Sequence, residues 1–197
     1  MRGDISILNK KINFKFYIFG VIGFILLLGL DRLTKHLALE HLRGTLGIDL
    51  IPGVLRLEYL ENTGAAFGVM QGQQTVLLII TVLVLGALIY EYTRIPEGKK
   101  YVILRFLAVF IAAGAVGNMI DRFVYNFVVD FIYFKLINFP VFNVADCYIT
   151  VAVLILFFVI LFYYKDDDLN FLFSKKKETI GIEAKEDDDS SDSKEGE

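Results

Sequence analysis

The sequence predicts an all-α membrane protein with four transmembrane helices. Hydrophobic residues occupy 55% of its 197 positions, and the mean hydropathy is +0.56. These residues are gathered into four long blocks instead of recurring at the spacing of an amphipathic helix. Such blocks are typical of chains that cross a membrane several times, and they exclude an ordinary soluble domain.

The first block, residues 16–30, follows three lysines and resembles the charged and hydrophobic regions of a signal peptide. No small-x-small cleavage site comes after it, so we interpret it as a retained helix. Fifteen residues rise only about 22 Å in a hydrocarbon core of roughly 30 Å, so we expect the helix to continue through Asp31 towards Ala38. Asp31 and Lys35 would then share one helix face.

Three further spans follow from the remaining blocks: Thr75 to Tyr92, Tyr101 to Ile120, and Val144 to Tyr164. Basic residues near the span ends are more numerous on the side that holds both termini. Cytoplasmic loops carry such an excess, so this distribution predicts cytoplasmic termini. The polar motifs described below would then face outward.

Two connections carry patterns of their own. After Pro52-Gly53, apolar and charged residues alternate over 54–59, which favours a half-buried strand on the membrane surface. The small, Gly-rich segment 62–68 follows, where a ligand can approach the backbone closely. Between the last two spans, residues 127–134 are apolar and aromatic around a single carboxylate, which predicts an interfacial segment.

The charge distribution divides the chain at about residue 164. Residues 165–197 hold 6 basic and 12 acidic residues with few aromatics, so we expect a disordered cytoplasmic tail. Residues 1–164 form the membrane domain and carry a net charge of +3. Cys147 is the only cysteine, so no internal disulfide can form and Cys-rich metal sites are excluded.

The most informative polar residues are Asp121, at the end of the third block, and Asp146, at the start of the fourth. If both blocks span the membrane, the two carboxylates lie on the same face. A pair of carboxylates at a membrane surface is the minimal equipment of an aspartyl peptidase.

Structural interpretations compete with this chemical one. Asn143 could cap the fourth helix, with Asp146 at the third helical position. Asp121 with the following arginine could simply end a span, and Asp31 with Lys35 suits a structural role better than a chemical one. His36 and His41 lack the spacing of a zinc motif, and Cys147 suits packing.

Five motifs, in order along residues 15–164, resemble those of bacterial lipoprotein signal peptidase, also called signal peptidase II. They are Asp31-x-x-x-Lys35, Asn62-Thr-Gly-Ala-Ala-Phe67, Gly117-Asn118-x-x-Asp121-Arg122, Val129-Asp130-Phe131 and Phe142-Asn143-x-Ala145-Asp146. The resemblance implies a peptidase of the bacterial inner membrane that cuts prolipoproteins just before a diacylglyceryl-modified cysteine. It also implies an extracytoplasmic β-cradle around residues 54–68 and a surface helix between the last two spans.

The same resemblance assigns roles to nine side chains. Asp121 and Asp146 would be the catalytic pair. Four polar residues would line the site and hold the substrate backbone: Asn62, Asn118, Arg122 and Asn143. Three others would support the fold or the site: Asp31, Lys35 and Asp130.

The expected chemistry needs neither a metal nor another cofactor. Two close carboxylates in a low-dielectric site share one proton, so one can deprotonate a water while the other donates to the scissile carbonyl. The expected partners are lipidated prolipoproteins and membrane lipids, with no nucleic acid, and we expect a monomer. A small proton-coupled transporter is the alternative, but the charges lie at one face instead of mid-span.

Overall fold

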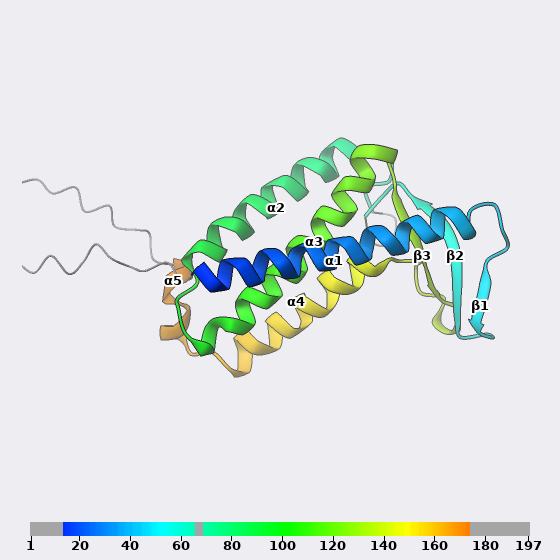
Figure 1. The fold of residues 1–197 in the computed structure, drawn as a ribbon. Coiled ribbons are helices and arrows are strands. Elements are labelled where there is room, and N and C mark those ends of the chain that lie inside the picture. The colour runs from blue at the N-terminus through cyan, green and yellow to red at the C-terminus, as the bar shows by residue number, and fades with distance from the viewer. Residues whose placement is uncertain (1–13, 66–68, 174–197) are drawn as a thin grey trace, which may run out of the picture.

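The computed structural model describes residues 14–65 and 69–173 and consists mainly of four long helices. They are α1 (Phe14–His41), α2 (Gln74–Arg94), α3 (Val102–Tyr125) and α4 (Val144–Phe162). Each is long and apolar enough to cross a membrane. The four predicted spans are therefore confirmed, and α1 continues past Asp31 as expected (Figure 1).

A three-stranded antiparallel sheet lies beyond one end of the helices (Figure 1). Its order is β1 (Ile48–Ile51), β2 (Leu55–Asn62) and β3 (Val128–Phe134). The predicted strand at 54–59 is part of β2, whereas β1 was not predicted. The sheet and the four helices confirm the expected fold class.

One detail of that expectation was wrong. The family resemblance implies a surface helix between the last two spans, whereas the interfacial position expected for residues 127–134 stays a prediction. Residues Val128–Phe134 form β3 instead, followed by only a three-residue 3-10 helix, η4 (Lys135–Ile137). The segment is rich in β-branched and aromatic residues, which favour strands, and β2 supplies a partner edge.

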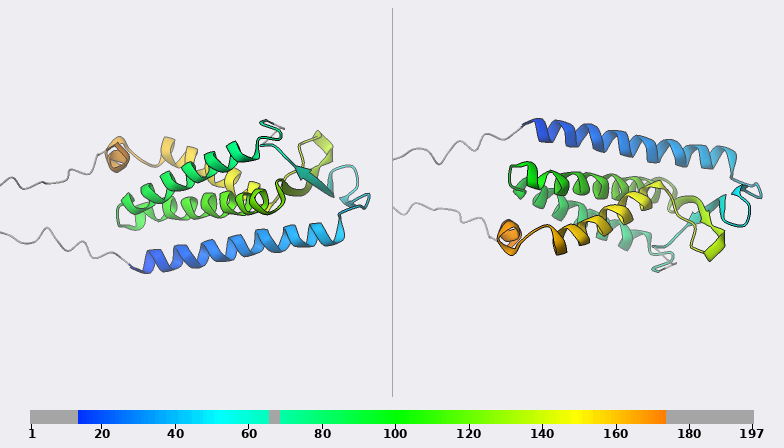
Figure 2. Two further views of the ribbon diagram at one scale, coloured as in Figure 1. Left: turned by 90° about the horizontal axis from the view of Figure 1, so that it is seen from above. Right: turned by 90° about the horizontal axis from the view of Figure 1, so that it is seen from below.

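The helix α3 holds the bundle together, because it packs against α1, α2 and α4 (Figure 2). It is also the most deeply buried of the four. Where α3 meets α4, a Cβ atom on Gly114 would lie only 2.5 Å from the carbonyl oxygen of Ala145. Small residues therefore allow the close helix contact that membrane bundles commonly use. On the other three helices many large apolar side chains are exposed, as lipid-facing surfaces require.

The first part of the acidic tail is folded. A 3-10 helix, η5 (Asp166–Leu169), leads into the short α5 (Asn170–Phe173), which lies at the end of the bundle opposite the sheet. Lys100 pairs with Asp168 at 2.5 Å, and the hydroxyl of Tyr164 donates to the carbonyl of Lys100 at 2.7 Å. The tail expected to be disordered thus begins with ordered structure, and residues 174–197 lie outside the described range. A further 3-10 helix, η3 (Lys99–Tyr101), precedes α3.

Candidate active site

All nine side chains singled out from the sequence lie at the sheet end of the bundle. They come from α1, the end of β2, the last turns of α3, β3, and the first turn of α4. Eight of them form one continuous network of hydrogen bonds and ion pairs. The ninth, Arg122, joins it through Gly64, whose carbonyl accepts from Nη2 at 2.9 Å and whose amide donates to Oδ1 of Asn62 at 2.9 Å.

A buried ion-pair cluster forms the inner part of the network. Lys35 lies 3.2 Å from Oδ2 of Asp31 and 2.9 Å from Oδ2 of Asp121, and all three side chains are 0% exposed. Arg32 pairs with Oδ1 of Asp121. Arg32 is a further residue of the site that was not predicted, although its i,i+3 spacing from Lys35 indicates a shared helix face. Two cations and two carboxylates therefore balance one another between α1 and α3.

Both carboxylate oxygens of Asp121 are paired within this cluster. Besides the two cations, its Oδ2 accepts the backbone amide of Val129 at 3.2 Å, which ties the end of α3 to β3. Neither oxygen is exposed, so a water molecule cannot reach this carboxylate without opening the cluster. This geometry fits the structural interpretation of Asp121 better than the predicted catalytic one.

Asn118 connects the ion-pair cluster to the outer part of the site. Its Oδ1 accepts from Lys35 at 2.7 Å and from Asn143 at 3.2 Å. With the oxygen held in this way, its Nδ2 is directed at Oδ1 of Asp146, at 2.8 Å. The hydrogen bond from the buried Lys35 therefore fixes the orientation of the Asn118 amide, and through it the donor that Asp146 receives.

Asp130 accepts only neutral donors. Asn143 donates to its Oδ1 at 2.6 Å, and Asn62 donates to its Oδ2 at 2.8 Å. Burial, and next the nearby negative charge of Asp146, raise the pKa of Asp130 from 3.8 to about 7. A carboxyl group with this pKa exchanges its proton near neutrality, as a general acid or base must.

Asp146 lies in the first turn of α4 and is half-buried, unlike Asp121 and Asp130. It closes a capping box: its amide donates to Oδ1 of Asn143 at 3.1 Å, and its Oδ2 accepts the amide of Asn143 at 3.1 Å. The capping role anticipated for these two residues is thus present. It leaves Asp146 beside Asn118, next to Asp130, and accessible from outside.

Comparisons with known proteins show the family of this chain. The pattern of a family described as "Signal peptidase (SPase) II" matches residues 23–162. The chain belongs to the signal peptidase II family. It is therefore a peptidase and, with four apolar helices, a bacterial integral membrane protein. All nine network residues lie within the matched range.

Similar proteins include the lipoprotein signal peptidases of Streptococcus thermophilus and Streptococcus pyogenes. The first is 38% identical over 68% of this chain and 87% of its own length. The second is 40% identical over 69% of this chain and 88% of its own. A solved structure described as "Bacterial membrane enzyme structure by the in meso method at 1.9 A resolution" is 29% identical, with a TM-score of 0.65 over 74% of this chain and 94% of that one.

The other residues considered from the sequence as possible metal ligands or nucleophiles of this signal peptidase II chain are two histidines and one cysteine. His36 and His41 are exposed and lie 3.8 and 4.0 Å from Glu40. Cys147 is free and half-buried. Within residues 14–65 and 69–173, no cluster of three or more His, Cys, Asp or Glu residues could hold a metal ion.

We expect Gly117→Ala to destabilise this signal peptidase II chain by about 1–3 kcal/mol. A Cβ atom at Gly117 would overlap Oδ2 of Asp31, whose Oδ1 is fixed by the amide of Ala145 at 3.1 Å. Thermal unfolding in detergent measures the effect. Gly86→Ala in α2 is the matched control, because nothing lies within 4 Å of a Cβ atom there. Equal midpoints for the two variants would show that the cluster tolerates displacement of Asp31.

Proposed function

We propose that the protein is an aspartyl endopeptidase that removes signal peptides from prolipoproteins, cutting on the amino side of a diacylglyceryl-modified cysteine. The names of its relatives and the four apolar helices support the substrate class. The carboxyl network at one end of the bundle supports the reaction type.

The catalytic pair in this proposal is Asp130 with Asp146, in place of the predicted Asp121 with Asp146. The observation that carries the change is that Asn143 hydrogen-bonds to both Asp130 and Asp146. Burial, and next the charge of Asp146, also raise the pKa of Asp130 to about 7. Asp121, by contrast, faces two cations and belongs to a closed cluster. A carboxyl group whose pKa is raised by a neighbouring carboxylate is suited to sharing a proton with it.

The reaction would begin with a water molecule near Asp146, the more accessible partner. Asp146 takes a proton from the water as it attacks the scissile carbonyl, while Asp130 donates its proton to the carbonyl oxygen. Collapse of the tetrahedral intermediate returns a proton to the leaving amine. Asn118 and Asn143 would act as positioning residues, because their side-chain amides hold Asp146 and Asp130.

The loop after β2 would bind the substrate backbone. Asn62 and Arg122 hold Gly64 from two sides, which fixes the backbone at Gly64 near the carboxyl pair. Both ends of the described chain lie at the opposite end of the bundle (Figure 1). We propose that this opposite end is cytoplasmic and that the site faces outward, as the distribution of basic residues favours.

The pH dependence of cleavage should follow Asp130. Because its pKa is raised to about 7, the protonated acid is present below that pH and is lost above it. We therefore expect kcat to fall about tenfold per pH unit on the alkaline side of pH 7. Carboxyl NMR of Asp130 in the wild type and in Asp146→Asn checks the cause, since removing the neighbouring charge should lower the pKa. A flat profile from pH 6 to 9 would contradict the assignment of Asp130 as the acid.

The deciding experiment for the function compares purified enzyme on a diacylglyceryl-modified prolipoprotein and on the same precursor without lipid. Acyl chains add roughly 0.8 kcal/mol per buried CH₂ and fix the depth of the scissile bond, so we expect about 100-fold faster cleavage of the lipidated form. A gel-shift assay in liposomes measures both rates. Equal rates would refute lipoprotein specificity, and proton flux without cleavage would favour the transporter alternative.

A further inference from the structure

Arg105 is a buried cation with an incomplete set of partners. It lies in the first turn of α3, far from the carboxyl network, and is only 7% exposed. Its Nη2 donates to the carbonyl of Ile95 at 2.7 Å, and the guanidinium lies over the rings of Tyr92 and Phe16 at 5.2 and 5.4 Å. Nη1 is buried and has no hydrogen-bond partner among the residues that the structure describes.

Among the residues that the structure describes, no acidic side chain pairs with this guanidinium. Cation–π contacts offset part of the cost of burying a guanidinium, but they do not satisfy an N–H group that points into a dry site. Elsewhere in the described ranges buried cations meet carboxylates, as Lys35 does with Asp31 and Asp121. An anion supplied from outside the chain would pair with the guanidinium of Arg105 in the same way.

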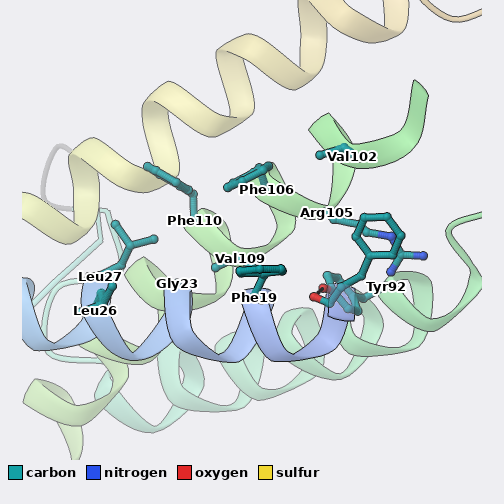
Figure 3. Close-up of a pocket in the computed structure, with 12 residues that line it drawn as sticks. Phe19, Gly23, Leu26, Leu27, Tyr92, Val102, Arg105, Phe106, Val109 and Phe110 are labelled. Atoms are coloured by element: carbon teal, nitrogen blue, oxygen red, sulfur yellow. Dashed lines mark hydrogen bonds between the residues drawn. The ribbon is translucent and has the colours of Figure 1, made fainter. Parts of the chain in front are cut away.

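A cavity of about 270 Å³ extends from Arg105 between α1 and α3 (Figure 3). Arg105 is the one charged residue among the twelve that line it, and the rest of the lining is apolar except for the hydroxyl of Tyr92. The lining on α1 runs from Phe16 to Leu27, which at 1.5 Å per residue is about 16 Å, or half of a hydrocarbon core. The cavity therefore has the length of one leaflet, with its charge at one end.

The outer rim of the cavity faces the space that lipid occupies. Phe19 on α1 is 70% exposed and Phe106 on α3 is 59% exposed. Between these rings the floor includes Gly20 and Gly23, whose missing side chains leave room beside Val109. An occupant could thus enter sideways from the bilayer.

We propose that this cavity binds one anionic phospholipid, with its phosphate at Nη1 of Arg105 and one acyl chain along α1 and α3. Only an amphiphile meets both requirements, because the apolar length calls for a hydrocarbon chain and the unpaired guanidinium calls for an anion. A signal helix is a poorer occupant, because its basic leading segment would meet Arg105 with like charge.

Native mass spectrometry of the delipidated, detergent-solubilised full chain tests the proposal. The chain is titrated with phosphatidylglycerol and with phosphatidylcholine of identical acyl chains. We expect the anionic lipid to bind about tenfold more tightly, and Arg105→Gln to remove that preference. Lys99→Gln is the matched control: it removes the same charge from an exposed site at the same end and should retain the preference.

A second pair of variants tests the hydrocarbon part independently of Arg105. Gly23→Leu fills the floor of the cavity and should lower binding of the anionic lipid several-fold, whereas Gly86→Leu on the open face of α2 should not. Circular dichroism establishes that each variant is folded. If Arg105→Gln does not fold, the comparison of Gly23→Leu with Gly86→Leu decides the question alone.

Three results would overturn the proposal. One is equal binding of the two lipids by the wild type. Another is unchanged binding in folded Gly23→Leu. The third is competition by glycerol phosphate at the same concentration as the lipid, which would reassign Arg105 to a free phosphate ester.

Discussion

We expect Asp130→Asn and Asp146→Asn each to lower kcat/KM for a lipidated prolipoprotein by roughly 10³-fold or more, because groups that act as a unit lose most activity when one member is removed. Asn preserves the size of each side chain, and its carbonyl oxygen can still accept one of the two hydrogen bonds that each carboxylate accepts. It can neither carry the shared proton nor accept one from water. The loss should therefore appear in kcat, with the thermal midpoint close to that of the wild type.

Asp121→Asn is the informative comparison for this prediction. It removes the anion that balances Arg32 and Lys35, so we expect a clear fall in thermal midpoint. The fraction that remains folded should keep measurable kcat, since the pair of Asp130 and Asp146 is intact. A stable but inactive Asp121→Asn, together with an active Asp130→Asn, would restore the pair predicted from the sequence.

The largest effect on stability is expected from Lys35→Met. Breaking a buried ion pair by removing one partner costs about 3–5 kcal/mol, because the other charge stays buried and unpaired. Here Lys35 separates two carboxylates that are both 0% exposed. Met matches the length of the side chain, so the loss reflects charge more than packing.

Thermal unfolding in detergent measures this loss, and a fall of roughly 10 °C is expected for a chain of this size. Lys99→Met provides the matched control, because Lys99 is exposed at the opposite end of the bundle. Its midpoint should stay within the error of the wild type. If Lys35→Met and Lys99→Met have the same thermal midpoint, the ion-pair cluster does not stabilise the fold. The surrounding helices would then hold the conformation of the cluster.

The helices could be predicted from the sequence because a membrane span needs about 20 apolar residues, a signal that dominates its surroundings. Strand β2 could be predicted from its alternation. Strand β1 could not, because Ile48–Ile51 is four residues long and exposed throughout, so it exists only by pairing with β2. Strand β3 was obscured for the opposite reason, since it is buried over Val128–Phe131 and shows no alternation.

Most of the candidate site could be anticipated from its residue types, but the pairing of the carboxylates could not. The topology puts Asp121, Asp130 and Asp146 at one end of the bundle without saying which of them meet. Because α3 continues to Tyr125, Asp121 lies one turn after Gly117, on the face that contacts α1. Asn118 contacts Lys35 of α1 as well, and it also reaches Asn143 and Asp146 at the start of α4. Spacing along α3 therefore does not reveal that only Asn118 of the two also contacts the start of α4.

The capping box has a consequence for how this enzyme can vary. The carboxylate of Asp146 accepts the amide hydrogen bond that caps α4, and the same carboxylate faces the site. One side chain therefore both starts the helix and supplies the reactive group. A longer acid such as Glu would carry its oxygens past the amide of Asn143 and would loosen both at once. We therefore expect substitutions in the exposed strand β1 to be tolerated more readily than substitutions in this turn.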